Sequence, residues 1–175
     1  MKAFPPSSAA MPIARAALRI LIVLNWLMGV AILALLVAMP NKEWIMSAFK
    51  LTPSPDADRL IMALRAIATI GLVAVPLHYA YLKQLLAIVD TVRAGDPFVS
   101  ANAARIQATA WILLVIQIFS VVIGTIGKAV SSPAHAVHLD AGFSIGGWLA
   151  VLLTFILARV FAEGARIRDD LEGVV

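Results

Sequence analysis

Four stretches of about 20 mostly apolar residues constrain this chain more than any other feature, because crossing the hydrocarbon core of a bilayer takes a helix of about that length. In lipid every backbone N–H and C=O must bond internally, which favours helices. Of the 175 residues, 62% are hydrophobic and 14% are charged, more apolar surface than a soluble domain can bury. We therefore expect an all-α, polytopic membrane protein, a single domain over 1–175 in which four transmembrane helices form a bundle. The expected spans lie near 17–39, 60–82, 106–127 and 141–160.

The first apolar run differs from a cleaved signal peptide. Its leader reaches from Met1 to Arg19 and contains Pro5 and Pro6. Signal peptides combine a short basic leader, an apolar core of about 7 to 15 residues and a small-residue cleavage site. This apolar run is longer than such a core and is followed by Val-Ala-Met-Pro at 37–40, which is a poor cleavage site. We therefore expect the helix to be retained as the first span.

Lysine and arginine are distributed unevenly between the two sides of the expected spans. Nine of the fourteen lie in the N-terminal segment, the middle loop and the C-terminal segment, and five lie on the opposite side. Cytoplasmic loops carry the excess of these residues, so we expect the N- and C-termini in the cytoplasm. Their scattering between apolar runs differs from the clustered basic face of a nucleic-acid-binding protein. The expected partner is therefore the lipid bilayer, with no direct contact to nucleic acid.

No catalytic or cofactor-binding pattern stands out in the sequence. It contains no cysteine, which removes disulfides, thiol catalysis and Cys-ligated zinc, and it has no GxSxG elbow or phosphate-binding P-loop. We therefore expect a protein that is not an enzyme and holds no cofactor. His135 and His138, with Asp140 nearby, carry side chains of the kind that bind divalent metals. Whether these histidines bind a metal stays open, because so short a pattern arises often by chance.

Strongly polar side chains inside an apolar span are costly and therefore mark candidate functional positions. Each candidate has a structural alternative. Asn25 and Gln117 can hydrogen-bond between helices, and Arg65 can extend towards the headgroups. His78, two residues after Pro76, is either a proton-sensitive switch or part of an interfacial aromatic belt. These four polar residues are the intramembrane candidates.

A cytoplasmic hairpin is expected over residues 84–105, between the second and third spans. Apolar residues recur there at helical spacing, so the second span should continue as an amphipathic helix. Gly95 can adopt the left-handed conformation that ends a helix, and Pro97 prevents the helix from resuming. Ser100 or Asn102 is expected to cap the third helix.

The C-terminal segment 160–175 should emerge from the fourth span as a cytoplasmic amphipathic helix. Its polar face mixes acidic and basic residues. Helices that lie on lipid surfaces are instead rich in Lys and Arg on the polar face. The mixed charge therefore argues against a purely lipid-binding helix.

Two strings in these segments resemble a known family. G-D-P-F-V-x-x-N-A-x-R at 95–105 is similar to the signature of the bacterial family named domain of unknown function 2975 (DUF2975), and F-A-E-G-A-R-I-R-D-D-L-E-G-V-V at 161–175 is similar to that family's C-terminus. The resemblance implies a small protein of the bacterial cell (inner) membrane, commonly encoded beside a small Cro/CI-type helix-turn-helix regulator. It implies no established activity.

Two functions follow as alternatives. The first is a multi-pass membrane partner or sensor for a cytoplasmic DNA-binding regulator, because the specified, charged segments all face one side. The second is a small transporter or channel, for which the chain would assemble as a homo-oligomer around the intramembrane polar residues. The candidate partner-binding residues are Asp96, Pro97, Phe98, Asn102, Arg105, Glu163, Arg166, Arg168 and Asp169.

Overall fold

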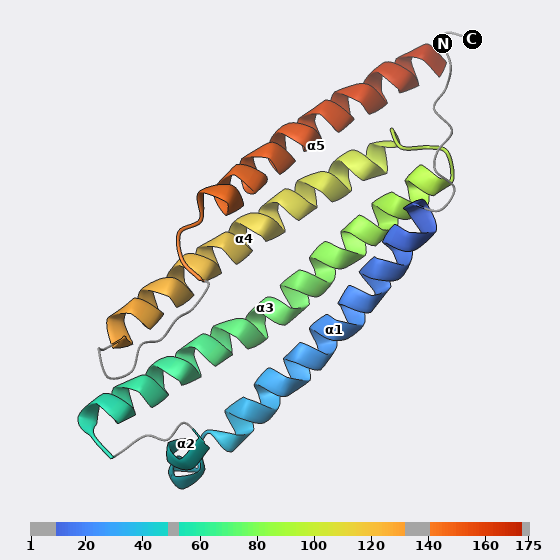
Figure 1. Ribbon diagram of the computed structural model, residues 1–175. Helices are drawn as coiled ribbons and strands as arrows, with labels where there is room; N and C mark the ends of the chain where they lie inside the picture. Colours follow the sequence, from blue (N-terminus) through green and yellow to red (C-terminus); the bar gives the residue numbers. More distant parts are fainter. Residues whose placement is uncertain (1–9, 49–52, 132–140, 173–175) are drawn as a thin grey trace.

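The computed structural model describes residues 10–48, 53–131 and 141–172, and all regular structure in these ranges is helical. Four helices are long: α1 (Ala10–Ala38), α3 (Pro55–Arg93), α4 (Ser100–Val130) and α5 (Ile145–Glu172). A short helix, α2 (Lys42–Ala48), lies between α1 and α3 (Figure 1). Each long helix contains a stretch long and apolar enough to cross a membrane. The expected all-α fold with four apolar helices is thus confirmed.

The four long helices lie side by side in chain order, and successive helices run in opposite directions (Figure 1). Extensive contacts join α1 with α3, α3 with α4 and α4 with α5. The outer helices α1 and α5 therefore each pack extensively against one long neighbour. Only 6% to 22% of each apolar window is buried inside the chain, so most of the apolar surface faces outward, where lipid can cover it.

The second expected span and its amphipathic continuation form one helix. Helix α3 has 39 residues. At about 1.5 Å per residue its length exceeds the thickness of a hydrocarbon core, roughly 30 Å. Ser54 caps its start, since its Oγ accepts a hydrogen bond from the Ala57 N–H at 3.1 Å. Its other end leads into the turn at 94–99. We call this end of the molecule the turn end and the opposite end the loop end.

The short helix α2 lies between the first two spans, where no helix was predicted from the sequence. Asn41 begins it, because Asn41 Oδ1 accepts from the Trp44 N–H at 3.1 Å. Ile45 is 1% exposed and packs with Met39 and Leu60 in the apolar core of the loop end. This short helix therefore fills the space between the end of α1 and the start of α3.

Helix α5, which contains the fourth expected span, begins at Ile145, four residues later than the expected start of that span. Gly142 has a φ of +138°, which a helix cannot contain. Ser144 then provides the helix start, since its Oγ accepts from the Gly147 N–H at 3.2 Å. Residues 141–144 thus lie across α4 before α5 begins, with the Gly142 N–H donating to Ser120 Oγ at 3.2 Å.

Gly124 permits this crossing, and we expect Gly124→Ala to destabilise the protein by about 1–3 kcal/mol. An added Cβ would lie 2.5 Å from Gly142 Cα and 2.6 Å from the Ala141 carbonyl oxygen, which are backbone atoms that cannot rotate away. Thermal unfolding in detergent micelles measures the loss. Gly146→Ala is the matched control, because its Cβ would meet nothing closer than Ser144 Oγ at 3.9 Å. Equal melting temperatures for the two variants would contradict the close contact.

Candidate interaction site at the turn between α3 and α4

The turn at 94–99 closes tightly on the end of α3. Gly95 has a φ of +88°, in the left-handed region that favours glycine. The Gly95 N–H donates to the Val92 carbonyl and the Asp96 N–H to the Thr91 carbonyl, both at 3.1 Å. The last carbonyls of α3 are therefore satisfied by the turn itself, and Gly95 ends the helix as its sequence position predicted.

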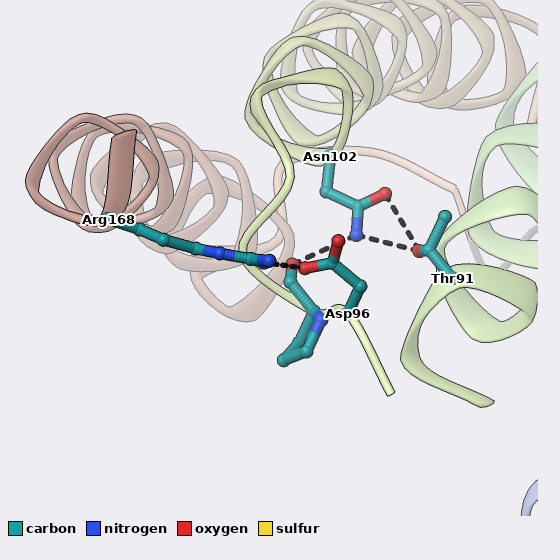
Figure 2. Close-up of polar contacts among 5 residues, drawn as sticks. Thr91, Asp96, Asn102 and Arg168 are labelled. Carbon is teal, nitrogen blue, oxygen red and sulfur yellow. Dashed lines mark hydrogen bonds and ion pairs between the residues drawn. The ribbon is translucent and has the colours of Figure 1, made fainter. Parts of the chain in front are cut away.

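Asn102 ties the turn to both helices from a fully buried position, with 0% exposure. Its Nδ2 donates to the Pro97 carbonyl at 3.0 Å and to Thr91 Oγ1 at 2.7 Å. Its Oδ1 accepts from Arg105 Nη1 at 2.8 Å. Figure 2 shows the amide of Asn102 directed back towards Thr91 and the turn. Buried amides that bond on both sides fix local geometry, because each lost bond leaves a polar atom unpaired.

The expected capping role of Ser100 or Asn102 is wrong. α4 begins after Val99, and no side chain caps its first N–H groups. The Asn102 N–H instead donates to the Val99 carbonyl at 2.8 Å. The amide of Asn102 is occupied by the turn, and its orientation away from the helix start explains the difference.

The turn seats on the C-terminal part of α5. The Phe98 and Phe161 ring centroids lie 5.3 Å apart, and Phe98 also covers Gly164, where an added Cβ would lie 3.1 Å from Phe98 Cδ1. Arg168 reaches across from α5 to form an ion pair with Asp96 (Figure 2). Residues 161, 164 and 168 recur at helical spacing and so form one face of α5. Segments 72 residues apart in the chain thus meet at one end of the molecule.

A second ion pair joins α1 to the same end. Arg15 Nε lies 3.1 Å from Asp90 Oδ1, and both side chains are partly exposed. The end of α3 and its turn therefore supply an acidic partner to α1 through Asp90 and to α5 through Asp96.

The remaining partner-binding candidates divide between this site and its surroundings. Arg105 and Pro97 belong to the Asn102 network. Glu163 and Arg166 are exposed on α5, beside the face of residues 161, 164 and 168 that meets the turn. The side chain of Asp169 and the two histidines His135 and His138 lie outside the described residues. Within the described ranges no group of three or more potential metal ligands occurs.

The polar side chains that are the intramembrane candidates make their hydrogen bonds at separate places in the structure. Asn25 Nδ2 donates to the Val75 carbonyl of α3 at 3.1 Å, an interhelical bond. Arg65 Nη2 donates to the Met39 carbonyl at 2.7 Å, at the end of α1. His78 Nδ1 lies 2.9 Å from the Ala74 carbonyl of its own helix, and as the protonated nitrogen it donates to that oxygen.

Gln117 faces α5. Its side chain is 9% exposed and packs on Gly147, where any Cβ would overlap the amide. Within the described part of the chain its Nε2 has no hydrogen-bond partner. The four polar candidates therefore sit in different contacts and do not form one site.

Four features of this end were not predicted from the sequence: Thr91, Phe161, Gly164 and the Arg15–Asp90 pair. The spacing of Phe161, Gly164 and Arg168 is a visible helical face. Nothing in a single sequence says that this face meets the turn.

Comparisons with known proteins identify a family over most of the chain. The sequence model of the family described as "Protein of unknown function (DUF2975)" matches residues 44–175. This range contains the turn and all of α5. No curated protein matches the chain, and no solved structure matches it.

Asn102→Ala is expected to lower the free energy of unfolding by about 1–3 kcal/mol, because the Pro97 carbonyl and Thr91 lose a buried partner. Ser100→Ala is the matched control and should change it by less than about 0.5 kcal/mol, since its exposed hydroxyl makes no capping bond. Denaturant unfolding in micelles measures both. Similar losses in the two variants would show that the buried amide is not the stabilising group.

A double-mutant cycle with Asp96→Asn and Arg168→Gln should give a coupling energy of about 0.2–1 kcal/mol, because the pair is partly exposed. Added salt should reduce the coupling through screening. The Asp56–Arg59 pair, 3.8 Å apart with side chains 79% and 80% exposed, is the control and should couple less. A coupling for Asp96 and Arg168 no larger than this control would contradict the contact.

Proposed function

We propose, from the premise that the chain belongs to the DUF2975 family, that it is a non-enzymatic membrane partner or sensor for a cytoplasmic DNA-binding regulator. The family description assigns no activity, so the proposal rests on the geometry of the turn end. It places the protein in the bacterial cell (inner) membrane as a multi-pass protein, with both termini and the turn in the cytoplasm.

The observation that carries the proposal is the seating of the turn on α5 through Asp96–Arg168 and Phe98. The turn at 94–99 and the C-terminal part of α5 form one continuous surface there. Phe98 remains 43% exposed although it contacts Phe161. Exposed aromatic side chains surrounded by polar groups are typical of the centres of protein interfaces.

The charges around Phe98 favour a protein partner. Arg93 and Glu163 are exposed near the turn end, and Arg166 and Asp170 are exposed along α5. A surface that carries both positive and negative charges favours specific binding of a partner with complementary charges over non-specific attraction to any oppositely charged molecule. The partner's class, a small Cro/CI-type regulator, comes from the gene neighbourhood that the family resemblance implies.

The cytoplasmic placement is supported by the arrangement of the helices. The start of α1 and the end of α5 both lie at the turn end (Figure 1). The excess of Lys and Arg belongs to the segments at this same end, and such an excess marks the cytoplasmic side.

The test is capture of the neighbouring regulator by the detergent-solubilised full chain. Phe98→Ala should reduce the captured regulator at least tenfold, because interface aromatics carry a large share of binding energy. Phe143→Ala is the matched control, since Phe143 is 72% exposed at the loop end, and it should retain wild-type capture.

Glu163→Lys distinguishes a lost contact from a misfolded turn. Because the Glu163 side chain is exposed, this substitution should weaken capture of the regulator without altering the melting temperature. Failure of the wild type to retain the regulator would overturn the proposal. Equal capture by the wild type, Phe98→Ala and Glu163→Lys would overturn it as well.

A small transporter or channel is the second candidate. Its support is Gln117, whose buried Nε2 has no partner within the described residues. Asn25 and Arg65 support it less, because both donate to backbone carbonyls. Since each long helix packs mainly on its chain neighbours, a transport path would need several copies of the chain, as a homo-oligomer.

A further inference from the structure

A groove runs along α4 and α5 beside the turn contact. Its part nearer the middle of the helices has a volume of about 270 Å³ and is lined by Ala103, Ala104, Gln107, Phe155, Ala158, Arg159 and Ala162. Its part nearer the turn end has a volume of about 370 Å³ and is lined by Ser100, Ala103, Ala162, Ala165, Arg166 and Asp170. The two parts share Ala103 and Ala162, so they form one continuous depression. Alanines on both helices leave the space open.

The groove lies at the boundary of the apolar lengths of both helices. In α5 the apolar run ends at Ala158 and Arg159 follows it. In α4 the apolar run begins at Ile106, directly after Arg105. Towards the middle of the helices the groove ends at Phe155, whose ring packs edge-on against Trp111 at 5.1 Å. One end of the groove is therefore apolar and the other is polar, as an amphiphile requires.

Arg159 supplies a free positive charge at this boundary. Its side chain is exposed, and among the described residues it has no ion pair or hydrogen bond. Gln107 adds an amide donor on the facing helix. Arg166 lies seven residues further along α5, about 10 Å along the axis. Among the described lining residues, the acidic one is Asp170, at the far end beside Arg166, so the unpaired positive charge of Arg159 is where an anion is favoured.

We propose that this groove binds an anionic phospholipid. The phosphate lies at Arg159 and Gln107, and the acyl chains extend over Phe155 and Trp111 towards the middle of the bilayer. Basic pockets between transmembrane helices at the membrane boundary are suited to anionic headgroups. Trp111 is 55% exposed, which leaves an aromatic surface for the chains.

The test is native mass spectrometry of the full chain from micelles that hold equal amounts of phosphatidylglycerol and phosphatidylcholine. The wild type should retain phosphatidylglycerol at least fivefold over phosphatidylcholine. Arg159→Gln should bring this ratio close to one. Arg19→Gln is the matched control, because Arg19 is exposed on α1, which packs extensively on α3 alone among the long helices, and it should keep the wild-type ratio.

Ala104→Leu provides a second variant that fills the groove without removing charge, and it should fold because Ala104 is exposed. It should lower retention of phosphatidylglycerol by a similar factor. A wild-type ratio in Arg159→Gln, or an equal fall in Arg19→Gln, would overturn the proposal. Dimeric ions that disappear in Ala104→Leu would assign the groove to a second copy of the chain and would also overturn it.

Discussion

Hydrocarbon offers a polypeptide no hydrogen-bond partner, and this constraint governs where the polar groups of the chain lie. The long helices satisfy most of their backbone internally. Where α1 ends, Arg65 donates to the Met39 carbonyl. On the neighbouring helix, Asn25 donates to the Val75 carbonyl, one residue before Pro76. Two of the costly polar side chains of the apolar spans, Asn25 and Arg65, thus place their donors on backbone carbonyls.

The two ends of the molecule are held by different kinds of contact. At the loop end, α2 places Ile45 against the ends of α1 and α3, and the Gly124–Gly142 approach seats the start of α5 on α4. At the turn end, a buried amide network and two ion pairs join the helices. The turn end thus carries two ion pairs in addition to its aromatic contact, and a charged surface of this kind suits a partner that is selected by its own charges.

Much of the fold could be predicted because its causes are local. Apolar length predicts the four membrane helices, helical spacing predicts the continuation of α3, and Gly95 marks its end. The short helix α2 was not predicted, because its sequence has no prolonged apolar periodicity, although Asn41 is a capping residue at its start. The start of α5 was placed too early, since hydropathy does not register the backbone conformation of Gly142.

The candidate site could be predicted only in part. Both strings that form it stood out, and Asp96, Phe98, Asn102 and Arg168 were among the residues named. Their pairing depends on how α5 lies against α4, with 72 residues between Asp96 and Arg168. Helix orientation of that kind follows from packing along the whole length, which one sequence does not reveal.

The charge arrangement of the two ion pairs has a mechanical consequence. In both, the hairpin of α3 and α4 contributes the acid and an outermost helix contributes the arginine. Dissolved ions reach such partly exposed pairs and weaken them, whereas they leave the apolar contacts of the opposite end intact. Concentrated electrolyte would therefore loosen the two outermost helices, α1 and α5, first at the turn end, while the loop end keeps its contacts.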